Sequence, residues 1–132
     1  MAKLNKGVEG VLYLQRAGAS HDYLFALRQP LSDLMATAGG GMRPTLAQVA
    51  ALNFQEEAKS FGCDGPKNSS DGNLDAASKS TADFTCPSRS ERMVVAVHGD
   101  YAYYLYFVSD NGTWSTNVAT LDAILQYWQW LQ

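Results

Sequence analysis

The stretch MVVAVHGDYAYYLYFV, residues 93–108, carries the clearest structural signal in this sequence. Its first half is rich in β-branched residues, and Gly99-Asp100 supplies a two-residue turn before a second apolar run, Tyr101–Val108. This pattern predicts a β-hairpin. Asn111-Gly112 then favours another tight turn, which leads to a third strand at Thr113–Ser115. The sequence therefore predicts a three-stranded antiparallel meander over residues 93–116.

A C-terminal helix is expected to follow the meander over residues 117–131. Asn117 can cap it, and its apolar side chains recur every three or four positions, at Val118, Leu121, Ile124, Leu125, Trp128 and Leu131. Trp128 lies on this stripe and should be buried against the sheet. Trp130 lies about 200° around the same helix and should be exposed. The strand 101–108 is apolar on both faces, which indicates either burial on both or an aromatic face offered to a partner.

A second helix is predicted over Leu46–Phe61. Pro44 and Thr45 form a start signal, and Gly62 supplies the stop. Most residues between them are good helix formers. This helix should bury a face rich in alanine and phenylalanine.

Two structures are compatible with the first forty residues. A helical period of apolar residues from Leu24 to Ala38 favours a helix over residues 20–38, which continues across Pro30. The alternative has strands at Val8–Gln15 and Tyr23–Leu27, with a short helix from Pro30. We expect the helix. In the alternative, the order ββααβββα resembles that of profilin-like and roadblock-like domains. Residues 7–11 resemble the opening strand of roadblock-like domains, and this resemblance identifies no site residue.

Residues 63–92 are mostly Ser, Asp, Asn, Gly, Lys and Pro, so a long polar loop is predicted that adds little to the core. Cys63 and Cys86, the two cysteines of the chain, stand near its ends. We expect them to form a disulfide that closes the loop. A disulfide would place the protein outside the cytoplasm or in a secreted form, whereas two free thiols would suit the cytoplasm.

Together these elements predict an α+β fold in one domain, residues 1–132. It comprises a helical N-terminal part (about 4–62), the polar loop 63–92, the meander 93–116 and the helix 117–131, with the small antiparallel sheet packed against N-terminal and C-terminal helices. No apolar run is long enough to span a membrane.

The charge distribution argues against nucleic-acid binding. The net charge is −3, and residues 93–132 contain no Lys or Arg, although nine of the 15 aromatic residues lie there. Proteins gain most of their affinity for nucleic acids from cations that neutralise phosphates. We therefore expect no nucleic-acid partner.

Catalytic motifs are absent from the sequence. Cys63, Cys86, His21 and His98 could supply four zinc ligands, but structural zinc sites normally take ligands as close pairs, so no metal and no cofactor are expected. A cysteine nucleophile with His98 as base and Asp100 as its orienting group is the enzymatic hypothesis that stays open.

By elimination, the sequence predicts a non-enzymatic module for protein–protein interaction or assembly, which presents an acidic, aromatic-rich surface to another protein or to copies of itself. The predicted partner-binding residues are Tyr101, Tyr103, Trp114, Tyr127 and Trp130. Four alternatives stay open: an extracytoplasmic pilin-like or other surface subunit; an inhibitor, immunity or phage-encoded anti-defence protein; a carbohydrate-binding module; and a small enzyme that uses His98 and Asp100.

Overall fold

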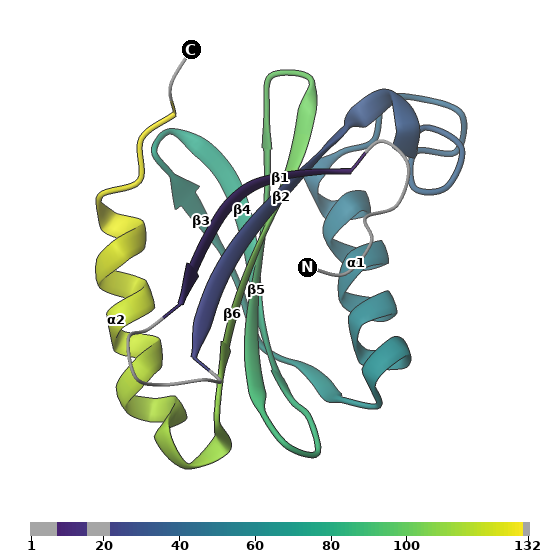
Figure 1. Cartoon of the computed structure of the whole chain (residues 1–132). Helices are drawn as coiled ribbons and strands as arrows, with labels where there is room; N and C mark the ends of the chain where they lie inside the picture. Colours follow the sequence, from purple (N-terminus) through teal and green to yellow (C-terminus); the bar gives the residue numbers. More distant parts are fainter. Residues whose placement is uncertain (1–7, 16–21, 131–132) are drawn as a thin grey trace.

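The computed structural model describes residues 8–15 and 22–130. Within these ranges the chain forms one antiparallel sheet of six strands with a helix on each face (Figure 1). The elements in chain order are β1 Glu9–Gln15, β2 Tyr23–Pro30, η1 Leu31–Leu34, α1 Leu46–Phe61, β3 Asp64–Leu74, β4 Ala77–Thr85, β5 Ser90–His98, β6 Tyr101–Ser109, η2 Asn111–Thr113 and α2 Trp114–Gln126.

The strand order in the sheet is β1-β2-β6-β5-β4-β3, so β1 and β3 are the two edge strands. β6 lies inside the sheet and pairs with β2 on one side and with β5 on the other. α1 packs mainly against β3, β4 and β5, and α2 packs against β6 on the opposite face. The predicted α+β class with an antiparallel sheet is confirmed.

Each face of the sheet has its own hydrophobic core. Tyr104 of β6 belongs to the cluster under α1, and its neighbour Leu105 belongs to the cluster under α2. Successive side chains of a strand point to opposite faces, so a strand that lies between two helices is apolar throughout. This explains the unbroken apolar run of β6.

The helix predicted over Leu46–Phe61 is confirmed. Thr45 is its N-cap: the Thr45 side chain accepts a hydrogen bond from the Gln48 backbone N–H, and the Gln48 side chain accepts one from the Thr45 N–H. Gly62 ends the helix with a φ of 62°, a left-handed conformation that glycine adopts without strain. The β5–β6 hairpin, with its turn at Gly99-Asp100, is also confirmed.

The helix expected over residues 20–38 is wrong. Tyr23–Pro30 is the strand β2, and a short 3-10 turn, η1, follows it, as in the alternative interpretation. Leu24 and Ala26 face the α2 side of the sheet, while Leu27 packs on the α1 side. A strand that is apolar on both faces also has apolar residues three and four positions apart. The helical spacing of the apolar residues therefore predicted the wrong element here. The order still differs from ββααβββα, because four strands rather than three lie between α1 and α2.

The third strand of the predicted meander is also wrong. Asn111–Thr113 forms the 3-10 turn η2, and α2 begins at Trp114 and ends at Gln126 rather than spanning residues 117–131. Asn117 is not a cap. It is buried, and its amide donates hydrogen bonds to the Asp22 carboxylate (2.8 Å) and the Ser109 hydroxyl (2.8 Å), which fix α2 to the sheet.

The polar segment 63–92 is not a loop, because most of it forms β3 and β4. β4 lies between β3 and β5 and buries Phe84 on the α1 side. β3 is polar because it is an edge strand with little to bury. Cys63, just after α1, is disulfide-bonded to Cys86, just after β4, as predicted.

Neither helix in the described part of the chain is long and apolar enough to cross a membrane.

Candidate functional site

Four aromatic side chains form a continuous row across β1, β2 and β6. We call this row the aromatic ladder; it comprises Tyr13, Tyr23, Phe25 and Tyr106. The ring centroids of Phe25 and Tyr106 lie 4.7 Å apart, those of Tyr23 and Phe25 5.8 Å, and those of Tyr13 and Tyr23 6.0 Å. The ring planes in each pair are within 24° of parallel. Such spacings are those of favourable aromatic pairs.

Strand register places these rings on one face. Tyr13, Phe25 and Tyr106 are directly opposite one another in the pairing of β1, β2 and β6, and Tyr23 lies two residues from Phe25. Tyr106 packs against the core under α1. Since α1 packs mainly against β3–β5, the β1–β2 side of the same face is left partly open, and the Tyr13 side chain is 51% exposed.

A buried carboxyl pair lies beside the ladder, where the C-terminal half of α1 meets β5. Glu57 and Glu91 are only 7% and 2% exposed. The Arg89 guanidinium donates a 2.7 Å hydrogen bond to Glu91 Oε1. Among the described residues, no hydrogen-bond partner lies at the buried Glu91 Oε2. The Glu57 carboxyl is a side-chain hydrogen-bond partner of Glu91, which requires a proton on one of the two carboxyls.

The pKa of Glu57 is raised well above its ordinary value, first because burial disfavours the charged form and then because the Glu91 carboxyl is so close. Burial also raises the pKa of Tyr23 and of Tyr106. At neutral pH these groups therefore carry their protons. The ladder therefore offers neutral rings and hydroxyl groups.

Arg89 supplies a positive charge near this surface. Its guanidinium lies 5.2 Å from the centre of the Phe61 ring, at the end of α1, and about a third of its side chain is exposed. Its charge also acts on the Tyr23 hydroxyl. The ladder therefore has an apolar centre and a partly neutralised cation at its margin.

Three of the predicted partner-binding residues, Tyr101, Tyr103 and Trp130, meet in a second aromatic cluster, which we call the aromatic corner. Trp130 stacks face to face on His98 with a centroid separation of 4.3 Å, and Tyr103 lies 4.7 Å from Trp130. Tyr101 lies 6.3 Å from Tyr103. These contacts join β5, β6 and the segment after α2.

Trp130 is half-buried and anchored, which differs from the exposure expected for it. Its indole Nε1–H donates to the Leu74 carbonyl (2.7 Å), and its backbone N–H donates to the Asp75 carboxylate (2.9 Å). The expected rotation of about 200° between Trp128 and Trp130 required both residues to lie in one helix. α2 ends at Gln126, before either of them. Both tryptophans are half-buried, and the corner fastens the segment after α2 to the β3–β4 turn.

The other two predicted partner-binding residues lie apart. Trp114, at the start of α2, packs against Phe107 at 5.9 Å, and Tyr127 is 83% exposed just after the helix. Tyr101 also lies under the Arg28 guanidinium at 4.3 Å. The structure therefore divides the predicted set among three places.

The residues of the enzymatic hypothesis serve other contacts. His98 stacks on Trp130, and the exposed Asp100 carboxylate lies 3.4 Å from the Arg43 guanidinium. Cys63 and Cys86 share a disulfide, so neither offers a thiolate to a metal or a substrate. His21, the remaining candidate zinc ligand, lies outside the described residues.

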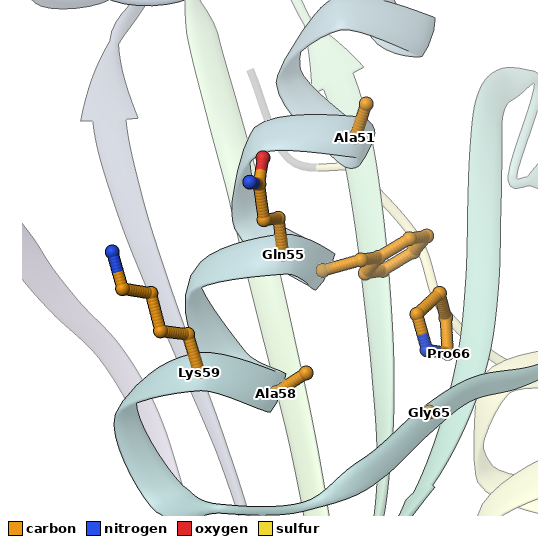
Figure 2. Close-up of a pocket in the computed structure, with 7 residues that line it drawn as sticks. Ala51, Gln55, Ala58, Lys59, Gly65 and Pro66 are labelled. Atoms are coloured by element: carbon orange, nitrogen blue, oxygen red, sulfur yellow. The ribbon is translucent and has the colours of Figure 1, made fainter.

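A shallow groove of about 580 Å³ runs between α1 and β3. Figure 2 shows Gly65 and Pro66 of β3 beside Ala58 of the helix, with Lys59 pointing away from them. The remaining lining residues are Ala51, Phe54 and Gln55. Of the described residues that line the groove, Lys59 alone is ionisable, so the groove is suited to an apolar side chain.

Sequence reasoning missed the ladder because residues 20–38 were interpreted as a helix. Its signal was present in the alternation of Tyr23 and Phe25 and in Tyr13 of the preceding strand. The buried acid pair was missed for another reason. Glu57 follows Glu56 on a helix, and only the tertiary packing shows that Glu57 faces inwards.

No protein-family model matches the sequence, and no curated protein matches it.

Proposed function

We propose that this chain is a non-enzymatic protein-binding module and that the aromatic ladder is its contact surface. The observation that carries this proposal is a row of four stacked rings on a sheet face that α1 leaves partly open. Tyrosine is enriched among the residues that dominate binding energy in interfaces, because it combines a large apolar area with a hydroxyl and few rotatable bonds.

The chemistry of the ladder defines the kind of partner. Neutral rings at its centre favour apolar or aromatic side chains, and the exposed part of Arg89 favours a hydrogen-bond acceptor at the rim. The partner is therefore a protein segment with apolar residues flanked by a carboxylate or carbonyl group.

The disulfide supports an extracytoplasmic or secreted location, because such bonds persist in oxidising compartments. A surface subunit or a secreted inhibitor agrees with both the disulfide and the ladder.

The experiment that tests the proposal compares two tyrosines. Immobilised wild type, Tyr13→Ser and Tyr127→Ser would each capture proteins from an extract of the native host, with quantification by mass spectrometry. Both side chains are exposed, but only Tyr13 belongs to the ladder. We expect a specific protein whose affinity for the purified chain falls roughly tenfold or more with Tyr13→Ser, the effect of one residue that dominates an interface.

Tyr127→Ser should bind the same protein as wild type does. Urea titrations of all three chains would show whether the variants are equally folded. Equal binding by wild type and Tyr13→Ser, or a loss confined to Tyr127→Ser, would refute the ladder as the contact surface.

A further inference from the structure

The two edges of the sheet differ in how well they resist pairing with another strand. β3 carries Pro66 and Lys67, and its pairing with β4 is irregular on both sides of Lys67. Proline, lysine and irregular pairing are the features with which natural sheets block edge-to-edge association. The first half of the β3 edge is therefore protected. Residues 70–74 pair regularly with β4, but they are polar apart from the buried Leu74 and include the charged Asp71.

The β1 edge has few such features. Among the described residues, three of the exposed large apolar side chains, Val11, Tyr13 and Leu14, lie on this one strand of seven residues. Its charged residue, Glu9, forms a 2.7 Å ion pair with Arg28. The single irregularity lies at Val11, between Gly10 and Leu12, and residues 12–15 pair regularly with β2.

From this asymmetry we propose that β1 pairs antiparallel with β1 of a second copy of the chain, about a two-fold axis at Tyr13. In this register Tyr13 faces Tyr13 of the other copy and Leu12 faces Leu14. No charged residue lies between Val11 and Gln15, so no like charges meet across the axis. β1 of a second copy carries the same uncharged residues, so the two strands can pair along this stretch.

The same register extends the aromatic ladder. Tyr13, Phe25 and Tyr106 are already in line across three strands, and a Tyr13 from the other copy would continue that line. Leu12 and Leu14 lie on the opposite face, where they pair with Ala26 and Leu24 of the core under α2. A two-fold axis perpendicular to the sheet keeps both ladders on one side, so the dimer presents one continuous row of rings. The pairing uses the edge of the sheet and is independent of what binds its face.

Cross-linking tests the register directly. In the proposed dimer Tyr13 is the residue opposite itself, and directly opposed Cβ atoms lie about 5 Å apart. Purified Tyr13→Cys, under mild oxidation, should form a covalent dimer on a non-reducing gel many times faster than Leu14→Cys on the same strand or Ser69→Cys on the β3 edge. Equal rates for the three variants would overturn the proposal.

Sedimentation of the wild-type chain over a concentration series provides a test without cysteine. We expect a reversible dimer, whose dissociation constant rises at least about tenfold in Tyr13→Lys, where two lysines would face each other. It should not change in Ser69→Lys. Concentration-dependent protection of the β1 amides from hydrogen exchange should accompany the dimer. A wild type that stays monomeric at every concentration would refute the pairing and would leave binding by the ladder face unaffected.

Discussion

Glu57 is a carboxylic acid whose protonation is coupled to folding. Burial and the nearby Glu91 raise its pKa from the ordinary value of 4.5. Above that value the unfolded chain loses this proton while the folded chain keeps it, so the folded state binds more protons and its stability falls as pH rises. The loss amounts to up to ~1.4 kcal/mol per pH unit, until pH reaches the raised pKa.

Glu57→Gln should remove this loss, because a carboxamide stays neutral and can still donate to Glu91. We expect urea unfolding to give similar stabilities for wild type and Glu57→Gln near about pH 5, and a variant that is more stable near about pH 8 by up to ~4 kcal/mol. Glu56→Gln, on the exposed neighbour, is the control and should follow the wild-type profile. Parallel profiles for wild type and Glu57→Gln would show that Glu57 is ionised in the folded protein.

Trp130 is predicted to matter for stability. Trp130→Ala removes the stack on His98 and the hydrogen bond to the Leu74 carbonyl, so it should cost roughly 2–4 kcal/mol. Trp130→Phe keeps a ring and loses the N–H, and it should cost about 1 kcal/mol. Tyr127→Ala, at an exposed site, should change stability by less than about 0.5 kcal/mol in the same urea titrations. If Trp130→Ala were as harmless as Tyr127→Ala, the corner would not hold the segment after α2.

At the scale of elements, the β3–β4 hairpin is expected to contribute to the core. Leu74, near its tip, is only 1% exposed and belongs to the cluster under α2. Leu74→Ala should therefore cost roughly 2–5 kcal/mol, whereas Ser69→Ala on the exposed part of β3 should be nearly neutral. Replacement of residues 67–79 by a Gly-Ser linker should be at least as destabilising as Leu74→Ala. A loss below about 1 kcal/mol for that replacement would restore the view of this segment as a dispensable loop.

Elements whose signals are local were predictable from the sequence. The limits of α1 follow from Thr45, Gln48 and Gly62, which act within one turn of the helix they bound. The β5–β6 hairpin likewise follows from its two-residue turn. These structures depend on neighbours in sequence, so the sequence alone identifies them.

The sequence alone does not decide the elements that depend on distant partners: β3 and β4 were expected as a loop, and β2 was a strand only in the alternative interpretation. β3 is polar along most of its length and is a strand because β4 pairs with it, while β4 in turn is held by β5. β2 has helical spacing and is a strand because β1 and β6 flank it. The aromatic ladder was not predicted for the same reason. Tyr106 was expected in a strand, whereas its neighbour Phe25 was expected in a helix.

For the molecule as a whole, the disulfide joins the end of α1 to the end of β4 across 23 residues. Closing a loop of this length should stabilise the fold by ~3.5 kcal/mol through restriction of the unfolded chain. Cys63→Ser/Cys86→Ser should lower the urea midpoint accordingly, and a reductant should do the same to wild type. Intact mass after alkylation without reductant should show no added label. Labelling of two thiols in the native protein would contradict the bridge and, with it, the extracytoplasmic assignment.

Because β2 pairs with β6, the sheet can be completed only late in the synthesis of the chain. Pro30 at the end of β2 lies opposite Tyr101 at the start of β6, so the first hairpin reaches its interior neighbour only after 71 further residues (101 − 30) have been made. Pairings so distant in sequence are slow to form, because the entropy of closing the intervening chain is lost before any contact compensates for it. Until β6 has been made, β1 is the one strand of the described part of the chain that can pair with β2. Leu24 and Ala26 stay unburied until β6 and α2 complete their core. The nascent chain therefore stays incompletely folded until β6 and α2 have emerged, and chaperones can bind it during that interval.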